Sequence, residues 1–556
     1  MCDHHKKTLS RRDWLALAGA ASIITMKRDP LYLLVKSMIN GMIVQSANAE
    51  NPNEYPRSYF LIMSQGGYNG WTSICGLQDV ANNPVQTHAV VRNKFNTPNY
   101  SGSLGDLAYG HYLWNSTSNN NQRPTYLPAI WETTIPTRSG GSAPMTSVLN
   151  NALIFRGTSM QADVGHDIGR ILVPQPDLSK PSVTGIAADK FVEVSRYLAA
   201  NSQMPLYQIP AFAQVSANVE QGLGYNSASG TGLYVARGRG SYATWLHKLL
   251  GGFSFDNPAI NLNNKALMEQ YISAALQELG DYHKSGKPGA ANLYDSYRNA
   301  EDLFRRSFGN LTDQWNALYA KYLDLAKRAA ASVPYLIPAG GTDPNSAGLS
   351  HMATEFALME FIRSNDLVGV TTFHRPGTID TGTFTHDLDE HTQEGRNMTR
   401  SVVAMNYWMR MVVAMINEFR TAVGATRWED TVVQLGTEFG REPRFAHTDG
   451  SEHGPDASHL LAFSGAIQEF QYGGNVQKNT QQTTNGTTYN QGCYGRSIPV
   501  QYTNDVGQLL TATITNEHMA STIARLVGVP SPVTAASLVE QVGATFKLRT
   551  ESPKTV

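Results

Sequence analysis

The 556-residue sequence contains few cysteines, few charged side chains and no excess of basic residues. Three cysteines, Cys2, Cys75 and Cys493, exclude a disulfide scaffold and a cysteine-rich zinc module. In a processed chain Cys75 and Cys493 either form one disulfide or remain two buried thiols. The 44 Lys and Arg residues are balanced by 45 Asp and Glu residues, so we expect no nucleic-acid partner. Charged residues make up 16% of the chain, against roughly 25% in an average globular protein, and such low charge is common among exported proteins.

Several familiar sequence motifs are absent as well. The chain has no Gly-x-x-x-x-Gly-Lys-Ser/Thr loop for phosphate binding and no Gly-x-Ser-x-Gly nucleophile elbow. Beyond the N-terminal region, no stretch reaches the roughly 18 uninterrupted apolar residues that a membrane span requires. We therefore expect no stable membrane span once the N-terminal segment is removed.

The first fifty residues have the features of an export signal. The pair Arg11-Arg12 precedes an apolar run that ends at Met26, and Ala47-Asn48-Ala49 supplies small residues before a cleavage point. This pattern resembles the twin-arginine signal; the alternative is an ordinary amphipathic helix that contains two arginines. We expect residues 1–49 to be removed and residues 50–556 to form one exported domain in the periplasm, on the cell surface or in the medium.

Short apolar runs that end in polar or glycine-rich segments predict buried strands. Continuous apolar strands are typical of a parallel sheet covered by helices on both faces. The runs cover residues 59–63, 152–155, 367–373 and 431–435.

Helical patterns separate these runs and complete the predicted fold. Apolar residues recur at helical spacing over residues 401–423 and 518–526. Strands that alternate with helices predict an α/β protein, a three-layer α/β/α sandwich with a mostly parallel sheet. We expect the helix-rich stretch 255–345 to be an insertion or cap, and the Gly-, Asn-, Gln- and Thr-rich segment 473–492 to be a surface loop.

Polar residues follow the predicted strands, at the edge where open parallel sheets bind ligands. Glu438 follows the run 431–435, and His453 comes fifteen residues later. A carboxylate and a neutral imidazole are suitable ligands for zinc or a similar ion. The alternative is structural, with Glu438 paired to Arg441 and His453 capping a loop.

A second polar cluster follows the run 367–373. Asp387 and His391 would share one face of a helix, whereas Asp389 and His391 would share one side of an extended turn. The sequence does not decide between these pairs. The cluster consists of His374, Asp380, His386, Asp387, Asp389, Glu390 and His391.

Two further candidate segments follow the other runs. His166 follows the run 152–155 and is a candidate metal ligand or catalytic general acid/base, the alternative being a hydrogen-bonded structural histidine. The segment Gly66-Gly67-Tyr68-Asn69-Gly70 follows the run 59–63, and its glycines permit close approach of the backbone to a ligand.

Taken in order, these segments resemble the exported DUF1501 family, whose fold is related to the alkaline phosphatase and sulfatase superfamily. The glycine turn at 66–70 is similar to the family's Gly-Gly-x-Asp-Gly, and residues 437–441 are similar to its Ser-Glu-Phe-Gly-Arg. His453-Gly454 is similar to the end of its Asp-His-Gly, and residues 517–529 are similar to its C-terminal helix.

The resemblance implies an alkaline-phosphatase-like fold and a metal-dependent hydrolase of phosphate or sulfate esters. A zinc, calcium or magnesium ion would activate a nucleophile and stabilise the charge of the ester. The partner would be a small anionic ester or a component of the cell envelope. Carried over by position, the metal ligands would be Asn69, Asp389, His391, Glu438 and His453.

The sequence departs from the family pattern at three positions. Asn69 stands where Asp is usual, and Glu452 replaces the Asp of Asp-His-Gly. Gly165 stands where a serine would be expected, so a hydroxyl nucleophile is not evident; Thr158 and Ser159 are nearby substitutes. The alternative function is a non-catalytic binding or cell-surface assembly protein on a degenerate hydrolase fold.

Overall fold

The computed structural model describes part of the chain. The described residues are 55–64, 66–67, 70, 73–74, 111–114, 125–160, 165–177, 179–200, 209–214, 235–238, 311–331, 347–366, 368–375, 378–380, 385–387, 398–441, 453–454, 456, 458–476, 481–484, 487–490, 496–504 and 506–549.

A mixed β-sheet with the strand order β16-β6-β15-β12-β1-β9-β7-β8 forms the centre of the protein. Neighbouring strands pair in parallel except at β15, which is antiparallel to both β6 and β12. The strands are β1 Ser58–Ser64, β6 Ala152–Thr158, β7 Ile209–Gln214, β8 Val235–Gly238, β9 Val368–Arg375, β12 Thr431–Thr437, β15 Ser458–Ser464 and β16 Gln471–Gly473.

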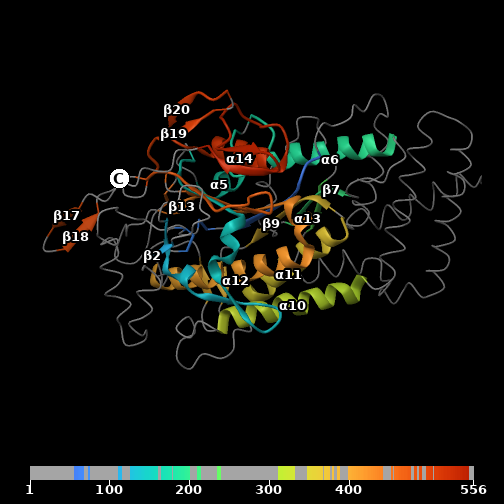
Figure 1. The fold of residues 1–556 in the computed structure, drawn as a ribbon. Coiled ribbons are helices and arrows are strands. Elements are labelled where there is room, and N and C mark those ends of the chain that lie inside the picture. Colours follow the sequence, from blue (N-terminus) through green and yellow to red (C-terminus); the bar gives the residue numbers. More distant parts are fainter. Residues whose placement is uncertain are drawn as a thin grey trace, which may run out of the picture.

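Helices cover both faces of this sheet (Figure 1). Side chains alternate along a strand, so Phe60 and Ile62 of β1 join one hydrophobic cluster while Leu61 and Met63 join the other. Helices α10, α11 and α12 contribute to the first cluster, and α5, α6 and α14 to the second. The helices are α5 His166–Leu172, α6 Val183–Ala200, α10 Leu311–Ala331, α11 Ala347–Ser364, α12 Met398–Val423, α13 Ala425–Glu429 and α14 Asn516–Val527, with 3-10 turns η3 Ala129–Glu132 and η4 Met145–Asn151.

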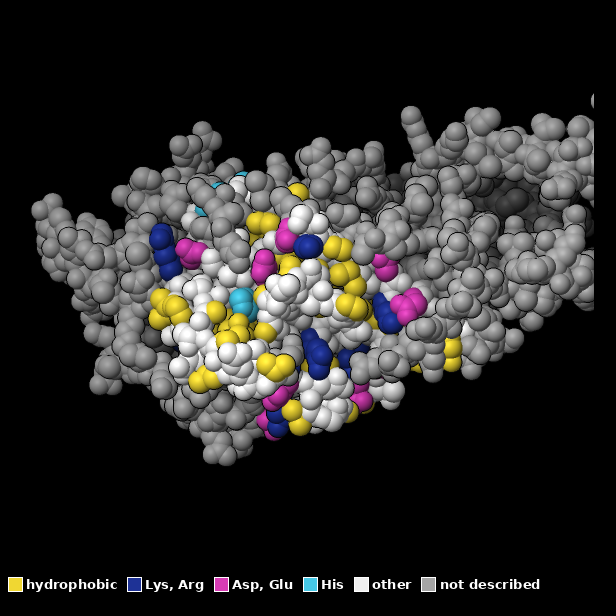
Figure 2. Space-filling view, turned by 90° about the horizontal axis from the view of Figure 1, so that it is seen from above, with side chains coloured by type: hydrophobic (Ala, Val, Ile, Leu, Met, Phe, Trp, Pro, Cys, Tyr) yellow, Lys and Arg dark blue, Asp and Glu magenta, His cyan; other side chains and the backbone are white. Residues whose placement is uncertain are grey.

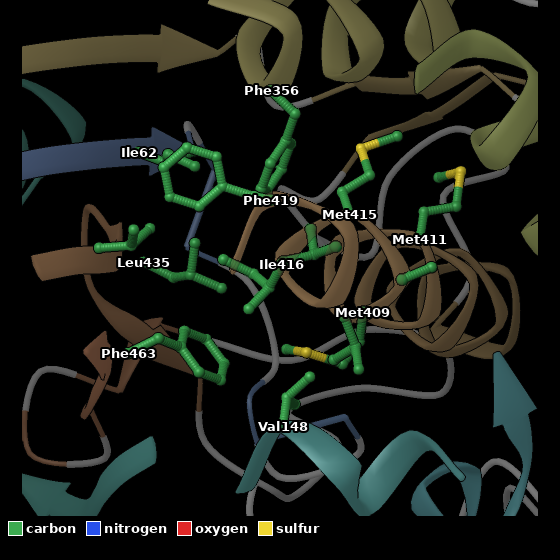
Figure 3. Packing of buried hydrophobic residues seen from close by; sticks show 14 of the residues in the cluster. Ile62, Val148, Phe356, Met409, Met411, Met415, Ile416, Phe419, Leu435 and Phe463 are labelled. Carbon is green, nitrogen blue, oxygen red and sulfur yellow. The ribbon is translucent and has the colours of Figure 1, made fainter. Parts of the chain in front are cut away.

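The larger cluster packs α12 against the sheet (Figure 3). Phe419 of α12 meets Phe60 of β1 edge to face, with the ring centroids 6.0 Å apart, and Ile416 lies beside it. Burial of such apolar side chains is the main force that holds a helix on a sheet, at roughly 25 cal/mol per Å² removed from water. The packing therefore fixes the sheet, and with it the position of every strand end.

Short antiparallel pairs of strands lie outside the central sheet. The pair β17–β18 lies within the segment 473–492, which was predicted to be a surface loop. The pair β10–β11 contains Asp380, His386 and Asp387 of the second polar cluster. The pairs are β2 His111–Trp114 with β3 Thr125–Pro128, β4 Thr134–Pro136 with β5 Ser142–Pro144, β10 Thr378–Asp380 with β11 Thr385–Asp387, β13 Gly440–Arg441 with β14 His453–Gly454, β17 Gln481–Thr484 with β18 Thr487–Asn490, β19 Val500–Thr503 with β20 Leu509–Ala512, and β21 Val539–Val542 with β22 Thr545–Leu548.

The structure confirms the coarse prediction of an α/β protein with a largely parallel sheet. The runs predicted as strands are β1, β6, β9 and β12, and the two predicted helices are α12 and α14. The surface-loop prediction for 473–492 was wrong in part, because β17 and β18 form a hairpin there. Within the stretch 255–345 the structure describes residues 311–331, which form α10. This helix packs in the core beside α11 and α12. Residues 1–49 lie outside the described residues.

The described surface carries charges of both signs. On the face shown in Figure 2, Lys, Arg, Asp and Glu side chains are interspersed rather than gathered by sign. Among the helices that the structure describes, none is both long and apolar enough to cross a membrane.

Candidate functional site

The candidate site lies at one edge of the sheet, where segments distant in sequence meet. Strands β1 and β12 run in parallel with Ser64 beside Thr437, so Gly66 and Glu438 leave the sheet together. Strand β6 runs in the same direction and leads toward α5, which begins at His166. Because β15 is antiparallel, His453, which precedes it, comes to this same edge.

A fully buried carboxylate is the centre of the arrangement. Oε2 of Glu438 lies 2.6 Å from Nδ1 of His166 and accepts a hydrogen bond from the main-chain N–H of Gly66 at 2.8 Å. The Glu438 side chain has no exposed surface, whereas 34% of the His166 side chain is exposed. The pair therefore joins a buried charge to an imidazole that solvent can reach.

Two rings pack together against one side of the His166 imidazole. The His453 ring meets it edge-on at a centroid distance of 5.2 Å, and the Phe439 ring lies at the same distance. Phe439 and His453 are closer still, with centroids 3.9 Å apart. These contacts limit rotation of the two histidines.

Arg441 holds the glycine turn that follows β1. Its Nε donates to the carbonyl of Gly67 at 2.7 Å, and its Nη2 donates to the carbonyl of Gly66 at 2.6 Å. Gly67 has φ +64, and a Cβ atom there would lie under 3.0 Å from the Phe439 ring. Thus the Glu-Phe-Gly-Arg segment and the Gly-Gly turn, which carry the family resemblance, are packed directly on each other.

The helix that carries His166 also touches the main chain of Glu438. Gly169 stands one turn after His166, and a Cβ atom on it would lie under 3.0 Å from the Glu438 carbonyl oxygen. Only glycine allows this approach, which sets the distance between α5 and the buried carboxylate.

A second hydroxyl–carboxylate contact lies at the end of β6. The hydroxyl of Ser159 donates to Oδ1 of Asp456 at 2.5 Å, and Ser159 is almost fully buried. Its main chain binds the segment before α14, through Ser159 N–H to Ile514 and Asn516 N–H to Ser159. Ser159, one of the two hydroxyls considered as nucleophiles, is therefore tied into the fold.

The structure brings three of the predicted site residues together: His166, Glu438 and His453. The other three, Asn69, Asp389 and His391, lie outside the described residues. Strand β9 ends beside β1, with Arg375 next to Ser64, so the chain toward Asp389 leaves from the same edge.

The described residues supply only part of the predicted set of metal ligands. Within them, no group of three His, Cys, Asp or Glu side chains is arranged around one point. Oε2 of Glu438 is already bonded to Gly66 and His166. A cation at this edge would depend on the three predicted ligands that lie outside the described residues.

Sequence reasoning missed two contributors to the site. Asp456 stood between two noted segments without being singled out, and Gly169 was overlooked although it follows His166 by three positions, the spacing of one helical face. Arg441 was considered as an ion-pair partner of Glu438, whereas its guanidinium donates to the carbonyls of the glycine turn.

Comparison with known proteins gives no further guide. No family model matches the chain, and no curated protein matches it.

Proposed function

We propose that the mature protein is an exported hydrolase of phosphate or sulfate esters, built on an alkaline-phosphatase-like version of the α/β fold. One observation supports this proposal above others. Segments that follow β1, β6 and β12 converge so that Glu438, His166 and the Gly66 N–H meet within hydrogen-bonding distance. Ligands of open α/β sheets bind at this edge.

Ester hydrolysis is accelerated by a group that takes a proton from the attacking oxygen or gives one to the leaving oxygen. Histidine performs this task near neutral pH because its ordinary pKa is about 6.5. His166 combines a buried partner with a partly exposed ring. It is the described residue of the site best suited to this role.

A divalent ion is part of the proposal. Zinc, calcium or magnesium, bound through His453 and the predicted ligands Asn69, Asp389 and His391, would supply positive charge that stabilises an anionic ester. The resemblance adds Glu438 to these ligands, but its Oε2 is already bonded to Gly66 and His166. Elemental analysis of the purified mature protein should find stoichiometric metal. Metal-free protein that remains folded would contradict this part of the proposal and favour a binding role.

The activity is tested with aryl phosphate and aryl sulfate substrates. The wild-type protein should turn over one of them, and His166→Asn should lower the rate by roughly 10²- to 10⁴-fold, the usual contribution of a general acid/base. Glu193→Gln is a matched control, because Glu193 is half exposed and pairs with Lys190 on α6.

The outcomes separate the two candidate functions. Turnover that falls in His166→Asn but not in Glu193→Gln supports the hydrolase. No turnover of either ester, with a folded protein, supports the non-catalytic binding or surface-assembly alternative. Turnover that is equal in all three proteins would show that the site lies elsewhere.

A further inference from the structure

We propose that Glu438 acts as a positioning residue, which holds His166 with its proton on Nδ1 and so makes Nε2 the atom that takes a proton from the attacking water. The inference rests on the proposed hydrolase function and deepens it. The resemblance implied a different role for Glu438, as a ligand of the metal ion.

The hydrogen-bond pattern at Oε2 determines the tautomer. An ionised carboxylate only accepts hydrogen bonds, and the Gly66 N–H already donates to the same oxygen. Nδ1 of His166, 2.6 Å away, must therefore be the donor. A neutral imidazole protonated at Nδ1 carries its lone pair at Nε2.

Burial makes this assignment stable. Glu438 is fully buried, and an unpaired buried charge would be strongly unfavourable. The N–H of Gly66 and the N–H of His166 provide the compensation. The carboxylate thus fixes the ring orientation, as carboxylate partners of histidine do in metal sites and catalytic triads.

The packing around the ring opposes a flip that would exchange the two nitrogens. Gly169 places α5 directly against the Glu438 main chain, and the rings of Phe439 and His453 pack side by side against the imidazole. Rotation of His166 would separate Nδ1 from its acceptor and leave Glu438 with one donor fewer.

The proton transfers balance during hydrolysis. Nε2 takes a proton from the attacking water as the new bond from oxygen to phosphorus or sulfur forms. The bond to the leaving group breaks with its electron pair on the leaving oxygen, which lies opposite the attacking water and takes a proton from solvent. His166 then releases the proton it took, also to solvent. Glu438 remains a carboxylate throughout, and it stabilises the imidazolium that exists between the two transfers.

The first test measures the tautomer and needs no activity. ¹⁵N spectra of protein labelled at histidine should show one ring with a protonated Nδ1 and an unprotonated Nε2, and this signal should vanish in His166→Asn. Glu438→Gln should shift the ring toward a mixture of tautomers, because an amide can either donate or accept. Glu193→Gln should leave the spectrum unchanged. If the signal that vanishes in His166→Asn is instead that of a ring protonated only at Nε2, the inference is overturned, whatever the protein hydrolyses.

The second test uses kinetics if ester turnover is found. Glu438→Gln should reduce kcat by about 10- to 100-fold with little change in KM, since loss of such partners has effects of this size. Glu438→Asp, which keeps the charge on a shorter side chain, should recover part of kcat and of the pH–rate profile. A direct metal ligand would behave differently, because Glu438→Gln would then lower the metal content while the tautomer stayed as in the wild type. If Glu438→Gln does not fold, the tautomer in the wild-type spectrum and the kinetics of Glu438→Asp still test the inference.

Discussion

Gly169 and Glu438 are in main-chain contact, and this contact places a helix against the buried carboxylate of the site. A Cβ atom at Gly169 would come under 3.0 Å from the Glu438 carbonyl oxygen. The relationship explains why a residue unfavourable in helices stands within α5.

Replacement of Gly169 by alanine should therefore destabilise the protein. In an unconstrained helix the change would add about 0.5–1 kcal/mol of stability, but here we expect a loss of about 1–3 kcal/mol through overpacking. Urea unfolding measures the effect. Gly165→Ala, at the start of the same helix with nothing within 4 Å, should change stability by about 1 kcal/mol or less. A stabilising Gly169→Ala would refute the contact.

Gly67→Ala tests the turn that Arg441 holds. Both the left-handed backbone, φ +64, and the Phe439 ring oppose a side chain there. We expect a loss of about 2–4 kcal/mol in the free energy of unfolding. Gly140→Ala is the control for backbone strain alone, since Gly140 has φ +85 but open space around it, and should lose about 1–2 kcal/mol. Equal losses would mean that the ring moves aside freely.

Lys321 of α10 should be essential for the layer of three helices. Its Nζ lies 2.5 Å from Glu360 of α11 and 3.1 Å from Glu418 of α12, and all three side chains are nearly buried. Tyr322 donates to Glu360 at 2.6 Å, and burial together with the Glu360 charge raises the pKa of Tyr322 well above its usual value.

Lys321→Met should reduce stability by about 3–5 kcal/mol, because Glu360 then loses its cation and Glu418 keeps only the exposed Arg138, at 4.0 Å. Adding Glu360→Gln and Glu418→Gln should restore most of this loss. Lys190→Met, which breaks the more exposed pair with Glu193, should cost at most about 1 kcal/mol. If the triple variant is no more stable than Lys321→Met, the loss arises from packing rather than charge.

His518 should make the stability depend on pH. It is the third residue of α14; its Nδ1 accepts the N–H of Thr515 at 3.3 Å, and its Nε2 lies 3.0 Å from the Tyr502 hydroxyl. Burial lowers the pKa of His518 to about 4. The Thr515 hydroxyl lies 2.9 Å from the same Nδ1. Protonation would place a hydrogen on Nδ1 and break the hydrogen bond from the Thr515 N–H.

The sign follows from the two pKa values. The unfolded chain, with a histidine pKa of about 6.5, binds the proton first as the pH falls. Stability is therefore complete above pH 6.5 and is lost as the pH falls from 6.5 toward 4, by roughly 3 kcal/mol in all. The difference in unfolding free energy between wild type and His518→Gln isolates this contribution, because glutamine can fill the same capping position without titrating. A pH-independent difference would contradict the prediction.

The strands that could be predicted from the sequence are those whose own residues form a continuous apolar run. The run 59–63 is apolar throughout, and a continuous run of this kind indicates burial on both faces whatever lies beside it. Leu460-Leu461-Ala462-Phe463 has the same character but was not identified as a strand, and its antiparallel direction depends on neighbours that sequence does not reveal. The hairpin β17–β18 was missed although Asn485-Gly486, between its strands, is the dipeptide most typical of a two-residue turn.

The candidate site was only partly readable for a similar reason. His166 and Glu438 were both candidates, but they are 272 residues apart and the chain has 15 histidines. Which histidine meets the carboxylate depends on how α5 packs, and so on Gly169, a residue with no chemistry of its own. The spacing of residues within one segment carries no information about such a contact.

The central place of β1 in the sheet has a consequence for the order of synthesis. The Ser58 hydroxyl binds a carbonyl 311 residues later in the chain, and the Tyr59 hydroxyl binds a side chain 375 residues later. At about 5–20 residues per second, the ribosome needs on the order of tens of seconds to supply these partners. During that interval the apolar strand β1 has neither of its neighbouring strands, β9 and β12. We therefore expect the nascent chain to bind a chaperone that prevents aggregation, and the sheet to form only late in translation.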